Sequence, residues 1–161
     1  MAFSAAPSDI LAGMALRFDP AHPSTLAIYC SDGRFTHAVE DHCEDLGHER
    51  IDTMTMPGGP ALLTSFPADL SEVHVFSRAA QFLIEGHGIR HVFVFAHEGC
   101  GFYRARCGRL PDAELRRMQI EHLHAAHASL RRHHPRLTVT CSYVSTADGT
   151  IAFADVTRAA D

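Results

Sequence analysis

Four short strand-like runs alternate with segments of helical periodicity, and this alternation limits the possible folds more than any other feature of the sequence. The runs span residues 26–29, 51–56, 92–96 and 137–144. The first and third are apolar throughout, which is typical of strands buried on both faces. Strands separated by helices of about 10–20 residues form right-handed βαβ units, so we expect a mainly parallel sheet.

Residue signals mark the expected helices between these runs. Thr36 can cap a helix that stops at Gly47, a longer helix runs from Ser71 to Gly86 or Gly88, and a third begins at Pro111 and stops at Pro135. Shorter helical turns are expected at residues 61–66 and 101–106. Asp148 and Gly149 predict a turn that brings residues 150–153 back as an antiparallel edge strand.

The fold class is therefore α/β: a single domain with about four parallel strands and an antiparallel edge strand, flanked by helices. We expect this domain at residues 25–161. Residues 1–24 are expected to form an N-terminal arm, with a short amphipathic helix around residues 10–16.

Composition excludes several classes of function. The formal net charge is -5, so no nucleic acid or anionic membrane is expected as a partner. No apolar run approaches the roughly 18–20 residues of a membrane helix, and the N-terminus lacks the features of a signal peptide, so we expect a cytoplasmic protein. All 14 residues of the Lys and Arg class are arginine, which excludes a P-loop lysine and a Schiff-base lysine.

Two clusters of metal-binding side chains follow the first and third runs. The first is Cys30-Ser31-Asp32-Gly33-Arg34 and the second is His97-Glu98-Gly99-Cys100-Gly101. The carboxyl ends of parallel strands meet at one edge of a sheet, so we expect the clusters to lie together. Two thiolates and one imidazole suit zinc, and three protein ligands leave a fourth position for water, as in catalytic zinc sites.

The remaining cysteines and the histidine-rich segment favour structural explanations. Cys43, Cys107 and Cys141 are expected to be buried structural residues, because five scattered cysteines do not suggest a disulfide framework. Five histidines gather near the end of the last long helix, and we expect a solvated helix face there: His122, His124, His127, His133 and His134.

The two clusters resemble the hallmark motifs of the β-class carbonic anhydrases, Cys-x-Asp-x-Arg and His-x-x-Cys-Gly. The resemblance covers roughly residues 25–108. It implies one zinc ion per chain, with Cys30, His97 and Cys100 as ligands. It also implies that Asp32 and Arg34 form the catalytic pair, with Asp32 a possible fourth zinc ligand.

The resemblance further implies the reaction and the assembly. Zinc-bound hydroxide would convert carbon dioxide to bicarbonate reversibly, Asp32 would accept its hydrogen bond, and Arg34 would keep Asp32 ionised. Family members form homodimers, often doubled into tetramers. The arginine and asparagines that the family commonly carries after its second strand are missing at residues 55–59. Gly58 and Gly59 could present backbone N–H groups to a substrate oxygen there, or could simply form a tight turn.

Two other functions are also compatible with these residues. The altered loop, together with the bulky Phe102 and Tyr103 after the second motif, would suit a related zinc hydrolase of carbonyl sulfide or carbon disulfide. A non-catalytic zinc-binding protein would keep the three ligands and hold the fourth position permanently, for example with Asp32.

Overall fold

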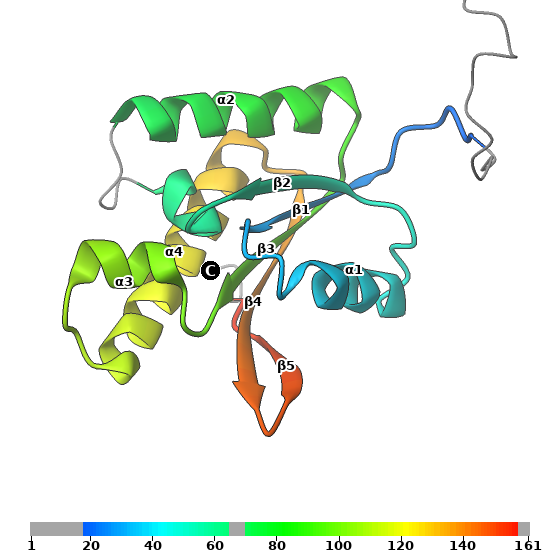
Figure 1. The fold of residues 1–161 in the computed structure, drawn as a ribbon. Coiled ribbons are helices and arrows are strands. Elements are labelled where there is room, and N and C mark those ends of the chain that lie inside the picture. Colours follow the sequence, from blue (N-terminus) through cyan, green and yellow to red (C-terminus); the bar gives the residue numbers. More distant parts are fainter. Residues whose placement is uncertain (1–17, 65–69, 158–161) are drawn as a thin grey trace, which may run out of the picture.

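The computed structural model describes residues 18–64 and 70–157, which form one α/β domain (Figure 1). The predicted arm of residues 1–24 lies mostly outside these ranges, and its expected helix lies wholly outside them. In chain order the elements are β1 (Thr25–Cys30), α1 (Thr36–Asp45), β2 (Asp52–Met56), the 3₁₀ helix η2 (Gly59–Leu63), α2 (Leu70–Gly86), β3 (His91–His97), α3 (Gly101–Cys107), α4 (Asp112–His133), β4 (Thr138–Ala147) and β5 (Thr150–Asp155).

The five strands form one sheet in the order β2-β1-β3-β4-β5. Strands β1 to β4 pair in parallel, and β5 pairs antiparallel with the carboxyl-terminal half of β4. The reversal occurs at Asp148 and Gly149, which both have positive φ. The predicted fold class is confirmed, including the edge strand.

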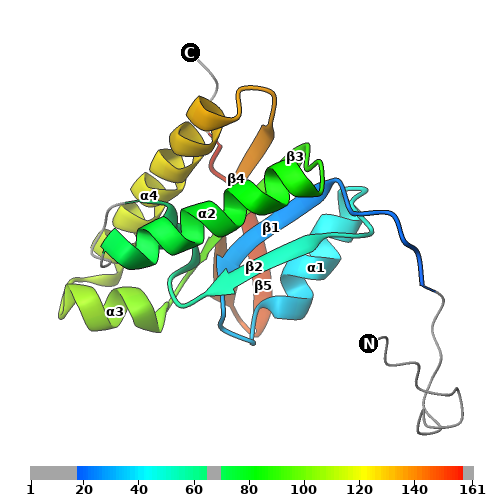
Figure 2. The ribbon, with the colours of Figure 1, turned by 90° about the horizontal axis from the view of Figure 1, so that it is seen from above.

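Side chains that alternate along each central strand fill two separate cores. Leu26 and Ile28 of β1 pack with buried residues of α2 and α4 on one face of the sheet. Ala27 and Tyr29 pack with Val39 and other residues of α1 on the opposite face. The ribbon seen from above shows α2 and α4 on one side of the sheet and α1 on the other (Figure 2). Burial on both faces explains why the sequences of β1 and β3 are continuously apolar.

The helices begin and end close to their predicted signals. Helix α1 is followed by Gly47 with φ +87°, and α4 begins directly after Pro111. The expected capping role of Thr36 is wrong, because Phe35 occupies the N-cap position and no side chain caps the helix. The short turn predicted at residues 61–66 starts earlier, at Gly59.

The histidine-rich end of α4 is less exposed than the sequence suggested. His122 Nδ1 lies 2.7 Å from the Tyr103 hydroxyl, and His124 Nε2 lies 2.8 Å from the Val156 carbonyl oxygen. The prediction of a uniformly solvated face is therefore wrong for these two residues. Separately, none of the helices in the described ranges has the length and apolar character needed to cross a membrane.

Candidate metal centre

The parallel sheet brings the two sequence clusters together at its carboxyl edge. Cys30 is the last residue of β1, His97 is the last residue of β3, and these two strands are direct neighbours. The chain then turns through Gly99, with φ +67°, to place Cys100 at the N-cap of α3. All three side chains are buried, with exposed fractions of 8% or less. The sequence predicted this meeting of two strand ends correctly.

The three donor atoms have the spacing that a metal ion requires. The two sulfurs and a ring nitrogen of Cys30, Cys100 and His97 all lie within 4.8 Å of one another, the one such group of three or more among the described residues. The Sγ atoms of Cys30 and Cys100 are 3.8 Å apart. Two thiolates on a tetrahedral zinc ion, each about 2.3 Å from it, would be separated by about 3.8 Å. The cysteine geometry therefore fits zinc.

The hydrogen bonding of the His97 imidazole also suits metal binding. Its Nδ1 lies 2.8 Å from the carbonyl oxygen of Glu98, and because a carbonyl can only accept, Nδ1 carries the proton. The lone pair is then on Nε2, which is buried and has no hydrogen-bond partner in the described structure. A buried nitrogen without a partner costs about 1–3 kcal/mol, and a metal ion would remove that cost.

Hydrogen bonds also favour negative charge on the sulfur of Cys30. The Cys100 thiol donates to Cys30, and this bond, with the nearby side chain of His97 and the backbone N–H groups of Gly58 and Asp32, lowers the pKa of Cys30 to about 4. The same contact, with burial, raises the pKa of Cys100, although the N–H groups of Tyr103 and Phe102 oppose the rise. Without a metal, the pair thus shares one proton, which a cation would displace.

Asp32 and Arg34 form an ion pair directly after Cys30. Arg34 Nη2 lies 2.6 Å from Asp32 Oδ2, and Arg34 Nε lies 2.9 Å from Oδ1. These bonds lower the pKa of the Asp32 carboxyl to about 2. Both carboxylate oxygens are thus engaged by Arg34, and Asp32 is not among the side chains whose donor atoms gather at the cluster.

Gly58 and Gly59 are both buried, and each has a packing reason to be glycine. Both have positive φ, +84° and +46°. A Cβ on Gly59 would lie 2.7 Å from the carbonyl carbon of Tyr29 and 2.8 Å from the nitrogen of Cys30, and one on Gly58 would overlap the ring of Phe102. This loop therefore packs directly against the end of β1.

The other cysteines lie apart from the donor group. Burial raises the pKa of Cys43 to about 11 and that of Cys141 to about 12, which keeps both thiols protonated at neutral pH. Cys107 is half-buried, and its Sγ lies 3.6 Å from the sulfur of Met118. These environments agree with the structural roles expected from the sequence.

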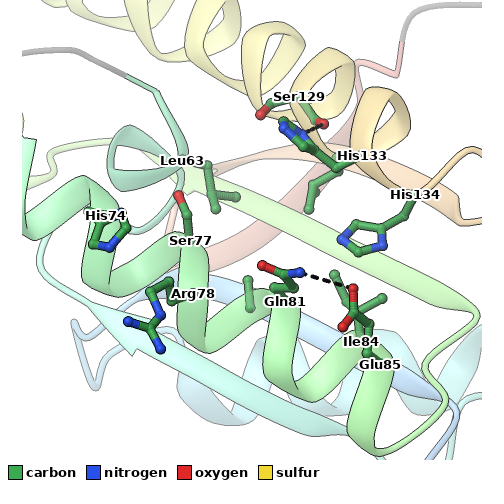
Figure 3. Close-up of a pocket in the computed structure, with 12 residues that line it drawn as sticks. Leu63, His74, Ser77, Arg78, Gln81, Ile84, Glu85, Ser129, His133 and His134 are labelled. Atoms are coloured by element: carbon green, nitrogen blue, oxygen red, sulfur yellow. Dashed lines mark hydrogen bonds between the residues drawn. The ribbon is translucent and has the colours of Figure 1, made fainter.

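Several cavities border α4, and two of them differ in their position relative to the cluster. One of about 550 Å³ adjoins the cluster, with Cys100, Tyr103, Arg116, Gln119 and Tyr143 in its wall. Gln119 is a buried polar residue that the sequence analysis did not select. The other cavity, of about 320 Å³, lies between α2 and α4 and is lined by His74, Arg78, Glu85, His133 and His134, among others (Figure 3). None of its lining residues belongs to the Cys30, His97 and Cys100 group, so it is separate from the candidate metal centre.

Solved structures of β-carbonic anhydrases have the same fold. Isoform I of the protozoan Trichomonas vaginalis aligns with a TM-score of 0.55 at 12% identity, over 87% of this chain and 87% of its own. One from the ascomycete Sordaria macrospora, described as tetrameric, has a TM-score of 0.52 at 14% identity, over 83% and 81%. One from Coccomyxa, solved with acetazolamide, has a TM-score of 0.52 at 12% identity, over 83% and 72%. At these identities the similarity establishes the fold alone.

Sequence comparison adds the family. No curated protein matches this chain. A family model described as "Putative carbonic anhydrase" matches residues 22–154, which include β1 to β4, all of β5 except its last residue, and both cluster motifs. The chain therefore belongs to this β-carbonic anhydrase-like family.

Proposed function

We propose that the protein catalyses the reversible hydration of carbon dioxide to bicarbonate, with one zinc ion per chain held by Cys30, His97 and Cys100. The observation that carries this proposal is the convergence of two sulfurs and a ring nitrogen of His97 within 4.8 Å at the carboxyl edge of the sheet, together with the buried Nε2 of His97, which has no hydrogen-bond partner in the described structure. Zinc with three protein ligands lowers the pKa of its water to about 7 and so supplies a nucleophile at neutral pH.

The protein's own groups orient the reactants. Asp32, kept ionised by Arg34, accepts a hydrogen bond from the attacking oxygen and directs a lone pair of that oxygen towards the carbon of the substrate. The backbone N–H of Gly58 faces the Cys30 sulfur, so in this proposal it stabilises the thiolate. A role of Gly59 and Gly58 in binding a substrate oxygen stays a prediction.

Stopped-flow hydration of carbon dioxide by zinc-loaded protein tests the proposal directly. We expect a rate well above that of buffer at pH 8 to 9. Asp32→Asn, which keeps the shape of the side chain but not its charge, should lower the rate while retaining zinc. A wild-type rate equal to that of buffer, with zinc bound, would exclude the proposed reaction.

A second candidate is hydrolysis of carbonyl sulfide or carbon disulfide by the same centre. The ring of Phe102 packs on Gly58, so this loop is shaped differently from the polar segment common in the family. Release of sulfide from either gas, with no carbon dioxide hydration, would favour this candidate. A zinc shell without exchangeable water at any pH would instead favour a non-catalytic zinc protein.

We also propose that the chain works as a homodimer or tetramer in the cytoplasm. The β-carbonic anhydrase of Sordaria macrospora is described as tetrameric. In this chain α2 exposes Val75 and Phe82, at 65% and 67%, which are large apolar side chains suited to a subunit contact. Sedimentation equilibrium of the zinc-loaded protein would measure the assembly, and a monomer at micromolar concentration would contradict it.

A further inference from the structure

We propose that Gln119 of α4 is a positioning residue of the metal centre, which holds the main chain of His97 so that its Nε2 meets the two sulfurs. The inference rests on the proposed function in one respect, that Cys30, His97 and Cys100 bind zinc. It adds Gln119, which lies 22 positions after His97 on a helix that contributes no residue to the two sequence motifs.

The contact itself is buried and has a defined direction. Gln119 Nε2 donates to the main-chain carbonyl oxygen of His97 at 2.8 Å. The Gln119 side chain is 3% exposed. The Tyr143 hydroxyl lies 3.5 Å from Gln119 Oε1, at the outer limit of a hydrogen bond, and Tyr143 is equally buried. The carbonyl of His97 can only accept, so the amide turns its Nε2 towards His97, and its Oε1 is left to accept from the Tyr143 hydroxyl.

The bond acts where the chain leaves the sheet. His97 ends β3, and the next residue, Glu98, donates its N–H to the carbonyl of Val144 at 2.8 Å. The ring of His97 is held through Nδ1 by the carbonyl of Glu98. Gln119 fixes the carbonyl of His97 between these two bonds, so the main chain and the ring are restrained together. The direction of Nε2 then follows from both restraints.

The position of Gln119 in its helix indicates that its amide serves the hydrogen bond to the His97 carbonyl. Gln119 lies between Leu115 and Leu123 in the buried stripe of α4. A leucine or methionine would bury as well there without any polar atom, whereas a buried amide is costly unless its hydrogen bonds are made. Groups that orient metal ligands from outside the coordination shell typically change metal affinity about 10–100-fold when removed.

The test compares two methionine variants of the same helix stripe. Gln119→Met keeps the length of the side chain and removes the donor. Leu123→Met, one turn further on, changes a fully buried residue whose side chain has no hydrogen-bond donor to lose. Zinc affinity is measured by competition with a chelator, and the d–d absorption of the cobalt-substituted protein reports ligand geometry. We expect Gln119→Met to bind zinc about 10–100-fold more weakly, with shifted cobalt bands, and Leu123→Met to match wild type in both.

The outcomes separate this inference from the proposed function. Equal zinc affinity and identical cobalt spectra for Gln119→Met and wild type overturn the positioning role and leave the proposed function intact. Wild-type protein that binds no zinc overturns both. If Gln119→Met does not fold, the ¹⁵N-labelled wild type gives a second readout. The side-chain amide protons of Gln119 should exchange slowly with solvent in the zinc-loaded protein, and rapid exchange overturns the inference.

Discussion

The guanidinium of Arg34 meets the carboxylate of Asp32 side by side, with Nη2 2.6 Å from Oδ2 and Nε 2.9 Å from Oδ1. The two residues are only two positions apart, so the ion pair forms within a single loop at the end of β1. Such a planar, two-bond contact fixes the carboxylate in direction as well as in charge. Asp32 is therefore held ready to accept a hydrogen bond at any pH near neutrality.

Replacing Arg34 should uncouple metal binding from activity. Arg34→Met removes both bonds to Asp32, so we expect the pKa of Asp32 to rise from about 2 towards its ordinary value of 3.8. Carbon dioxide hydration should fall about tenfold or more, because a carboxylate free to rotate orients the reacting oxygen poorly. Zinc content should stay at one per chain. The carboxyl ¹³C titration of Asp32 and stopped-flow hydration measure the two effects.

A matched control exists on α4. Arg117 pairs with Glu121 on the exposed side of that helix, at 3.2 Å. Arg117→Met should leave the hydration rate and the titration of Asp32 as they are in wild type. An equal loss of activity in both variants would mean that Arg34 acts only through the overall charge of the protein.

Gly59→Ala should destabilise the protein and weaken its metal centre. The positive φ of +46° is unfavourable for alanine, and the new Cβ would lie within 2.8 Å of backbone atoms of Tyr29 and Cys30. The backbone conformation alone costs about 1–3 kcal/mol. Gly33→Ala provides the comparison, because nothing lies within 4 Å of its Cβ position and the change should stay within about 0.5 kcal/mol. Urea unfolding measures the stability of both variants, and similar losses of unfolding free energy in Gly59→Ala and Gly33→Ala would contradict the packing argument.

Much of this centre was predictable from the sequence because its parts are local. Cys30 and His97 each end an uninterrupted apolar run, and parallel strands bring such ends together. Gln119 was not predictable in the same way. Helical periodicity allows position 118 or 119 on the buried stripe, and an apolar residue such as Met118 fits a stripe of this kind better than glutamine, yet Met118 is only half-buried. The carbonyl that selects Gln119 belongs to a distant strand end, which no pattern within the helix reveals.

The same limit explains why the sequence does not predict the partial burial of two histidines of α4. The sequence of α4 predicts exposed imidazoles near its end, yet His122 and His124 meet partners from α3 and from the segment after β5. Periodicity assigns residues to faces of a helix, but it does not say what covers each face. The loop at Gly58 and Gly59 is a third case, because its fit against Phe102 and the end of β1 depends on tertiary packing.

His91 should make stability fall as the solution becomes mildly acidic. Burial, with a smaller effect of nearby His48, lowers the pKa of His91 to about 4. The imidazole stacks on Phe93 at 4.2 Å between ring centroids, and its Nε2 lies 2.9 Å from Thr140 Oγ1. As the pH falls below 6.5, His91 binds a proton in the unfolded chain but stays neutral in the folded protein. Stability is therefore complete above pH 6.5 and lost progressively down to about pH 4.

His91→Phe keeps the aromatic stack and removes the titrating group. Between pH 7 and pH 5 we expect wild type to lose about 1–2 kcal/mol more unfolding free energy than the variant, after allowing for partial exposure to solvent. Urea unfolding of zinc-free protein at both pH values measures the difference. Parallel losses in the two proteins would show that His91 does not contribute to acid sensitivity.

Removing zinc should destabilise the folded protein, and replacing one of the two cysteine ligands should be enough to prevent zinc binding. In the proposed site a metal ion would satisfy the buried Nε2 of His97, so zinc binding should be linked to folding. At free zinc 100-fold above its dissociation constant, zinc binding adds about 2.7 kcal/mol to the free energy of unfolding, and a chelator should abolish this gain.

Cys30→Ser should hold less than about a tenth of the wild-type zinc, because it removes one of only three protein ligands. Cys107→Ser, whose sulfur contacts Met118 instead, should retain one zinc per chain. Metal analysis of the purified proteins measures both, and zinc retained by Cys30→Ser or lost from Cys107→Ser would show that the ion binds elsewhere.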